Sequence, residues 1–258
     1  MKKTDFSYLS ERKKILYEQM ARSYRSQDRQ KHIDWVPFKE RLIDSRITLI
    51  SVAGAYTSDQ KPFTAEGKEQ DYEPREINLG ATKENLNFTS LDWEQSEVKK
   101  DFNVVLPIER LVLLQKEGMI GKINEPVYSF SGHNANKKFL MKYVSHTAEK
   151  IKASESNGVL IVPCSPRTSE TACLIASEIE RRGVSTVMLT LFYEQALIMA
   201  PPRCAFVNFP FGRPFGKADH VTLHTAVLRD TLRLLEKTKI PGEVLSLNFV
   251  WSFGEIPV

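Results

Sequence analysis

The sequence predicts an α/β protein with a mainly parallel sheet, helices on both faces of that sheet, and a helical extension at the N-terminus. Short runs of branched apolar residues alternate with longer stretches whose apolar residues recur at helical spacing. Most residues of these runs are apolar or β-branched, which is typical of parallel strands buried on both faces. With 258 residues, of which 41% are hydrophobic, the chain is long enough for one large domain or two small ones.

The N-terminal extension covers residues 1–45. Residues 5–30 predict an amphipathic helix because Phe6, Leu16 and Tyr24 lie near helical spacing. A second short helical stretch ends near Ser45. This extension holds 11 Lys and Arg against 7 Asp and Glu, whereas residues 46–258 carry 25 of each sign. Its apolar face packs either on the same domain or on a partner subunit.

The remaining residues, 46–258, are predicted to form one α/β domain with Rossmann-like or flavodoxin-like layers, and a division into two α/β halves near residue 100 stays open. The polar stretch 57–101 is too long for an ordinary connection, which indicates a functional loop or a small inserted unit. The predicted helices cover 107–118, 134–155, 168–182 and 219–238, and the predicted strands cover 47–56, 103–106, 126–130, 158–163, 185–191 and 203–209.

Composition argues against several classes of protein. Three cysteines without paired spacing, no apolar leader and no apolar run near 18 residues predict a cytoplasmic protein that does not cross a membrane. The balanced charge of residues 46–258 gives no support for nucleic-acid binding, and no glycine-rich nucleotide motif occurs. His220 and His224 have the spacing of metal ligands, but without a third ligand we predict no metal site.

Residues 164–169, CSPRTS, are predicted to turn from a strand into a helix at the carboxyl edge of the sheet, where ligands bind in such folds. Ser165 or Thr168 can cap the helix, and Ser169 follows in its first turn. Free N–H groups there, with Arg167 nearby, favour an anion: a bound carboxylate, a phosphate or the thiolate of Cys164 with a depressed pKa. Alternatively, Cys164 is a small buried apolar residue.

Three other loops at this edge supply candidate binding residues. Tyr56 and Asp59 follow the first strand and can hold an amino or carboxylate group, or they are ordinary turn formers. His133 is either a base or thiolate partner, or part of a helix-capping region. Arg213, in the Gly- and Pro-rich loop 209–216, can bind a substrate carboxylate with two hydrogen bonds.

Five stretches together carry a resemblance to a known family. They are VAGAYTSDQKPF (52–63), PREINLGAT (74–82), DFNVVLPIERLVLLQKEGMIGKINEPVYSFSG (101–132), NGVLIVPCSPRTSETACLIASEIERRGVST (157–186) and PPRCAFVNFPFGRPFGKADHVTLHTAVLRDTL (201–232). The chain resembles the selenoprotein B subunits of the glycine, sarcosine, betaine and D-proline reductases over roughly residues 46–240. Residues 1–45 lie outside this likeness.

The resemblance implies reductive cleavage of a carbon–nitrogen bond in an amino acid or betaine. It implies no cofactor in this chain and attack by a selenocysteine that opens a U-x-x-C motif. The expected partner is a pyruvoyl-bearing subunit, which binds the substrate amine in the glycine, sarcosine and D-proline systems, or a thiol reductant. An ungapped alignment places the selenocysteine position on Ser165 and the cysteine position on Thr168, so Cys164 lies one residue early. We also expect a homo-oligomer.

Three functions follow from this departure. In the first, Cys164 replaces the selenocysteine, while Ser165, Arg167, Thr168 and Ser169 shape the substrate-binding turn with Tyr56, Asp59, His133 and Arg213. In the second, the chain is a non-catalytic binding or accessory subunit that has lost the redox pair. In the third, Cys164 serves a non-redox cysteine enzyme such as an isomerase or lyase.

Overall fold

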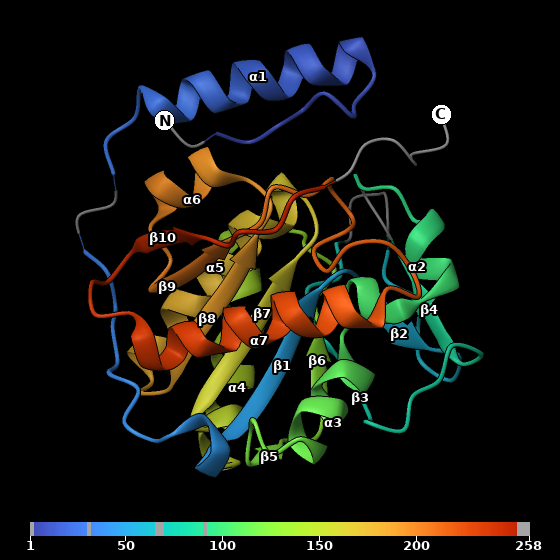
Figure 1. The fold of residues 1–258 in the computed structure, drawn as a ribbon, viewed down its shortest axis with the longest axis vertical. Helices are drawn as coiled ribbons and strands as arrows, with labels where there is room; N and C mark the ends of the chain where they lie inside the picture. The colour runs from blue at the N-terminus through green and yellow to red at the C-terminus, as the bar shows by residue number, and fades with distance from the viewer. Residues whose placement is uncertain (1–2, 30–31, 65–69, 90–91, 252–258) are drawn as a thin grey trace.

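The computed structural model describes residues 3–29, 32–64, 70–89 and 92–251. An eight-stranded sheet forms its centre, with the order β10-β9-β8-β7-β1-β6-β3 and with β5 also pairing with β1 (Figure 1). Its neighbouring strands are parallel except for β3, which runs antiparallel to β6. The strands are β1 Arg46–Val52, β3 Arg75–Ile77, β5 Lys122–Ile123, β6 Val127–Ser129, β7 Gly158–Pro163, β8 Ser185–Thr190, β9 Arg203–Phe206 and β10 Glu243–Ser246; β2 Ala55–Thr57 and β4 Leu86–Phe88 form a separate antiparallel pair.

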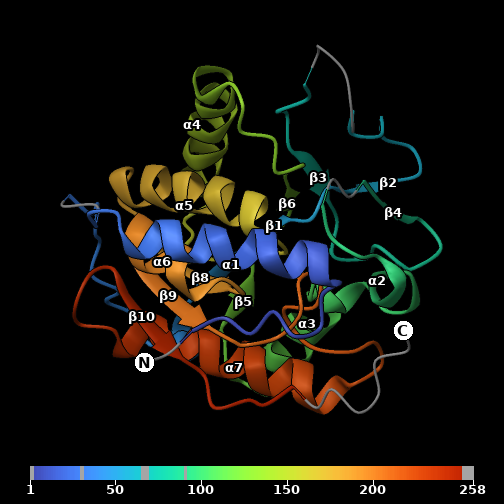
Figure 2. The ribbon, with the colours of Figure 1, turned by 90° about the horizontal axis from the view of Figure 1, so that it is seen from above.

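Helices cover both faces of the sheet. Figure 2 shows α4 and α5 on one side and α3 and α7 on the other. The α-helices are α1 Glu11–Arg25, α2 Ser96–Lys100, α3 Ile108–Lys116, α4 Lys137–Ala153, α5 Pro166–Arg181, α6 Tyr193–Met199 and α7 Val221–Lys237; two 3₁₀ helices are η1 Leu42–Asp44 and η2 Phe102–Val104. The predicted α/β class with a mainly parallel sheet is therefore confirmed, as is a helix in the N-terminal segment.

The core consists of two apolar layers, one on each face of the sheet. Leu160 and Val162 of β7 point into the layer shared with α3 and α7, whereas Val159 and Ile161 point into the layer shared with α4 and α5. This alternation is the period of a strand, and both sets are buried because both faces are covered. Strands from either side of residue 100 share this one sheet.

Two predicted strands differ most from the structure, while the predicted strand 203–209 ends early, at Phe206. Residues 103–106 were expected to be extended, but Phe102–Val104 form a 3₁₀ turn because the carboxylate of Asp101 accepts the backbone N–H of Asn103 at 2.9 Å. The predicted strand 47–56 is broken at Gly54, whose φ of 68° ends β1 before β2 begins. A run of buried apolar residues indicates burial, and it fits a buried turn as well as a strand.

The N-terminal segment packs on its own domain. Its helix begins at Glu11 rather than residue 5 and ends at Arg25, and the predicted second helical stretch is only the 3₁₀ turn Leu42–Asp44. The hydroxyl of Thr4 donates to Glu194 at 2.7 Å, and Phe6 is buried against Phe192. Figures 1 and 2 show α1 lying across the end of the sheet toward which β7 points.

The connection from α1 to β1 is held by a buried ion pair. Arg203 of β9 and Glu180 of α5 are fully buried and lie 2.8 Å apart. Both side chains also bind the backbone of Val36, where Glu180 accepts the N–H and Arg203 donates to the carbonyl, and both have further hydrogen bonds to Thr186. Trp35 stacks on the Arg203 guanidinium at 3.6 Å. None of the described helices is both long and apolar enough to cross a membrane.

Candidate functional site

The topology places a crevice at the carboxyl ends of β1 and β7. The chain passes from β1 to β6 on one side and later returns to β7 on the other. In open parallel sheets, ligands bind at the point where the strand order reverses in this way. The turn 164–169, between β7 and α5, lies at this point.

Ser165 and Thr168 cap α5 with their own side chains. The Ser165 hydroxyl accepts the Thr168 N–H at 3.3 Å, and the Thr168 hydroxyl accepts the N–H groups of Cys164 and Ser165 at 2.8 Å each. The predicted helix cap is therefore confirmed, in the form of a capping box. Both residues are only 1% exposed, so their hydroxyls are occupied inside the turn. Ser169 is also buried and donates its N–H to the Ser165 carbonyl.

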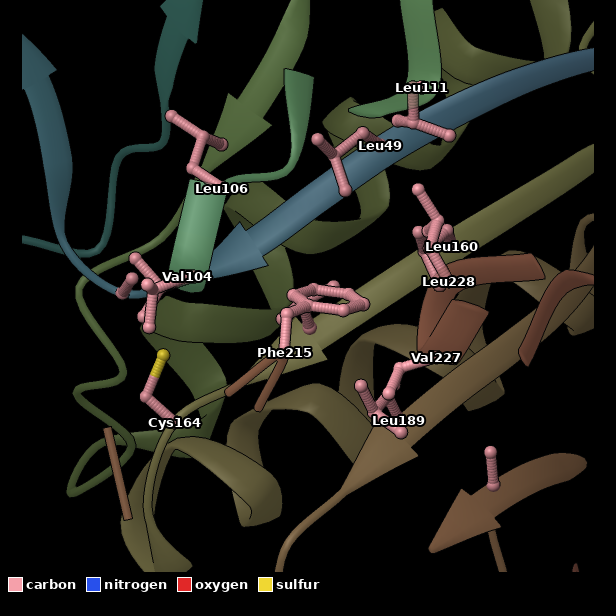
Figure 3. Packing of buried hydrophobic residues seen from close by; sticks show 14 of the residues in the cluster. Leu49, Val104, Leu106, Leu111, Leu160, Cys164, Leu189, Phe215, Val227 and Leu228 are labelled. Atoms are coloured by element: carbon pink, nitrogen blue, oxygen red, sulfur yellow. The ribbon is translucent and has the colours of Figure 1, made fainter. Parts of the chain in front are cut away.

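Cys164 is fully buried, with an exposed fraction of 0%. Figure 3 shows its sulfur pointing toward Val104, within the apolar layer that also holds Leu160. Burial, and then the negative charge of Asp92, raise the pKa of the Cys164 thiol well above its ordinary value. The expected depressed pKa is therefore wrong, because the sulfur faces the core and not the free N–H groups of the helix.

Asp92 is the residue of this site that the sequence did not reveal. Its Oδ1 accepts the Ser165 hydroxyl at 2.8 Å, and the backbone N–H of Arg167 donates to the same carboxylate. Burial raises the pKa of Asp92, while these hydrogen bonds and the charge of the exposed Arg167 oppose that rise. The carboxylate thus lies at the start of α5, where a bound anion was expected.

The loop 209–216 contacts the same turn. The N–H of Gly212 donates to the Cys164 carbonyl at 2.7 Å. Gly212 has a φ of 83°, and a Cβ there would lie 2.7 Å from the Glu94 carbonyl, so this position requires glycine. Arg213 is buried and pairs with Glu94 at 3.2 Å. Residues 92–94, the turn and this loop therefore meet at one place.

A pocket of about 560 Å³ opens beside this meeting point. Asp92 and Trp93 line one part of it, Phe211 and Arg213 another, and the N-terminal residues 8–17 a third. The hydroxyl of Tyr8 accepts the N–H of Phe211 at 3.1 Å, which fixes the N-terminal wall. A second hollow, of about 810 Å³, lies between residues 3–7 and α1. It shares no lining residue with the first pocket.

The other predicted binding residues do not line the 560 Å³ pocket. Tyr56 packs edge-on against Phe63, with the ring centroids 6.5 Å apart. Asp59 is exposed, and a hydrogen bond from Thr57 lowers its pKa. His133 is buried, with Nε2 2.8 Å from the Thr64 carbonyl. Their roles as substrate contacts stay predictions.

The structure also locates the helix cap near His133 and the histidine pair at positions 220 and 224. The side chain that caps α4 is Asn136 rather than His133. His224 is buried, with Nε2 2.6 Å from the Lys217 carbonyl, and His220 is exposed at the start of α7. Among the described residues, no group of three or more His, Cys, Asp or Glu side chains is arranged to hold a metal ion.

Comparison with known proteins identifies the family. The profile of glycine/sarcosine/betaine reductase selenoprotein B (GRDB) matches residues 29–164, which is more than half of the chain. The chain belongs to this family. The selenoprotein B match begins before residue 46, so it includes part of the segment that the resemblance left out. Residues 1–28, which contain α1, lie outside the matched range.

The individual relatives are named as subunits of amino-acid or betaine reductases. The chain is 23% identical to the D-proline reductase subunit gamma of Acetoanaerobium sticklandii over 83% of this chain and 88% of that subunit. It is 23% identical to the glycine reductase complex component B subunit gamma of Symbiobacterium thermophilum over 59% of this chain but only 36% of that protein. It is 28% identical to the betaine reductase complex component B subunit beta of Peptoclostridium acidaminophilum over 38% of this chain and 22% of that protein. No solved structure matched the chain.

Proposed function

We propose that the chain is a component of a reductase complex that binds a small amino-acid-like or betaine-like substrate and does not itself supply the attacking thiol or selenol. The relatives are named as subunits of D-proline, glycine and betaine reductases, which supports the assignment to such a complex. The turn at the start of α5 is the observation that supports the second part of the proposal, namely that this chain does not supply the attacking thiol or selenol. Ser165 and Thr168 occupy the two redox positions of the resemblance, and the adjacent thiol of Cys164 is sealed in the core.

The chemistry of the turn supports a binding role. Reductive cleavage of a carbon–nitrogen bond needs two electrons, and a pair of hydroxyl groups cannot supply them by forming a selenide–sulfide or disulfide bond. The thiolate is the reactive form of a cysteine, and burial keeps Cys164 in its neutral form. In this proposal the electrons come from a thiol or selenol on another chain, and a pyruvoyl-bearing partner subunit takes part where the substrate carries an amine.

Catalysis by Cys164 stays a prediction. One observation favours it, since Cys164 is the described cysteine at the turn itself, directly before Ser165. Both the reductive mechanism and the non-redox cysteine enzyme need the sulfur to reach a substrate. Local opening of the turn would have to break the hydrogen bonds of the Cys164 backbone to Thr168 and Gly212.

Alkylation of the native protein separates these functions. Each cysteine is followed by peptide mass spectrometry from pH 5 to 9, with the urea-unfolded protein as the reference for full reactivity. We expect Cys164, Cys173 and Cys204 to react far more slowly in the native protein than in the unfolded one, because all three are buried. Rapid native labelling of Cys164 below the free-thiol pKa of about 8.5 would refute the binding role and support the cysteine nucleophile.

A second test uses the reconstituted complex. Cys164→Ala removes the sulfur, and we expect the reductase activity of the complex to persist if another chain supplies the electrons. Val162→Ala is the matched control, because Val162 is buried in the same apolar layer and carries no reactive group. Loss of activity with Cys164→Ala but not with Val162→Ala would assign the chemistry to Cys164.

A further inference from the structure

We propose that the 560 Å³ pocket binds a small organic cation, with Asp92 as its charge partner, aromatic rings around it and the N-terminal segment as one wall. This inference deepens the proposed function, on which it rests for the idea that the chain is a binding component. It adds the ligand class, the residue that selects it, and a role for residues 8–17.

Three acidic and three cationic side chains line the pocket; of the cationic ones, Lys13 is exposed to water, and the other two are paired with acids. Arg213 binds Glu94 at 3.2 Å, and Lys100 lies 3.5 Å from Glu97. Asp92 remains as the acid without a lysine or arginine ion pair at this distance in the described residues, although the charge of Arg167 acts on it. Its two hydrogen bonds come from neutral groups, and a carboxylate has about four acceptor positions, so it can still accept from an ammonium group.

An anion would be disfavoured at the same place. The Ser165 hydroxyl and the Arg167 N–H both donate to Asp92. These are the donors that a carboxylate or phosphate would need at the start of α5. A second anion would therefore lose these donors to Asp92 and would also be repelled by its charge.

Four aromatic residues are among those that line the pocket, namely Tyr8, Tyr17, Trp93 and Phe211. Tyr17 and Phe211 meet edge to face with centroids 5.1 Å apart, and Tyr8 meets Phe211 in the same way at 6.1 Å. Ring faces attract cations, most strongly when the site is shielded from water. A carboxylate beside several rings is thus suited to an amine or a quaternary ammonium group.

Two of these rings come from the N-terminal segment. Hydrogen bonds between backbone N–H groups and side chains hold it in place, since the Asp5 N–H donates to the Asn208 side chain at 2.9 Å and the Tyr8 hydroxyl accepts the Phe211 N–H. Residues 1–28 lie outside the matched family range. The pocket is consequently built by this chain's own extension together with the carboxyl edge of the sheet.

Choline and its uncharged isostere 3,3-dimethylbutan-1-ol test the ligand class, with binding to the full chain measured by calorimetry or ligand-observed NMR. We expect choline to bind at least about tenfold more tightly than the alcohol, and Asp92→Asn to remove most of that difference. Tyr17→Leu keeps apolar bulk but removes a ring, and should weaken choline binding several-fold. Glu18→Gln is the control, because Glu18 lines the other hollow and not this pocket.

Equal binding of choline and the alcohol would overturn the inference, as would unchanged choline binding by Asp92→Asn. If Asp92→Asn does not fold, the isostere comparison and Tyr17→Leu still decide. Failure here differs from failure of the proposed function. Inert cysteines with no preference for choline would reject only the ligand class, whereas a reactive Cys164 with choline binding intact would reject only the claim that this chain does not supply the attacking thiol.

Discussion

The buried thiol of Cys164 predicts a specific loss of stability at alkaline pH. Burial raises its pKa in the folded protein, whereas a cysteine in the unfolded chain has a pKa of about 8.5. A group whose folded pKa is raised stabilises the fold below the unfolded pKa, and this contribution is lost as the pH rises above that value. Wild type should therefore lose stability above about pH 8.5 relative to Cys164→Ala, which has no proton to lose at this position.

The size of the effect follows from proton linkage. While the folded protein keeps the proton and the unfolded chain has lost it, stability falls by about 1.4 kcal/mol per pH unit for one thiol. At pH 10, about 1.5 units above the unfolded pKa, the loss is roughly 2 kcal/mol. The alanine variant also loses core packing, but that cost is the same at every pH and appears as a constant offset.

Urea unfolding of both proteins from pH 7 to 10, followed by circular dichroism, measures this difference. Val162→Ala is the control, because its offset from wild type should not change with pH. A constant offset for Cys164→Ala over the whole range would mean that Cys164 titrates in the folded protein as it does when unfolded. If wild type instead gains stability relative to Cys164→Ala between pH 7 and 8.5, the pKa of Cys164 in the folded protein is depressed. Either result would refute the raised pKa of the buried thiol.

Three further substitutions test contacts of the site and of the N-terminal connection. Ser165→Ala removes the cap of α5 and should lower the free energy of unfolding by about 1 kcal/mol in urea, and no loss would contradict the capping role. Arg203→Met leaves Glu180 buried without its partner and should lower the free energy of unfolding by about 3–5 kcal/mol. Adding Glu180→Gln should recover part of this loss, and a double variant whose loss equals the sum of the two single losses would show that the pair is not coupled. Tyr8→Phe removes the acceptor of the buried Phe211 N–H, should cost about 1–3 kcal/mol in thermal or urea unfolding, and should weaken ligand binding in the pocket, so unchanged stability would place that N–H in contact with water.

Much of the fold was predictable because burial on both faces leaves a clear pattern. The strands predicted at 158–163 and 185–191 follow runs rich in apolar and β-branched residues, and the structure reproduces them within one residue. The same signal failed at 103–106, where local hydrogen bonds from Asp101 form a turn inside the core. The short edge strand β10 and helix α6 were not predicted, because their patterns are too short for periodicity to show.

The site was predictable only where its contacts are local. The cap by Ser165 and Thr168 spans three residues, so the sequence contains it. The orientation of Cys164 was also present in the sequence, since Leu160, Val162 and Cys164 share one parity along the strand and all three enter the same apolar layer. Asp92 was not predictable, because it lies 73 residues from Ser165 and comes from a stretch without periodic pattern.

The position of Asp92 connects the absence of a redox pair at the turn with the character of the pocket. A helix start provides donors that favour an anion, and in the family resemblance the group at this turn is a selenol that can ionise. Here Ser165 cannot provide that charge, and a carboxylate from another part of the chain accepts its hydroxyl hydrogen. Because the anion now belongs to the protein, the ligand beside it must be neutral or positive. One substitution, Asp92→Asn, therefore tests whether this turn is the charged end of a binding pocket.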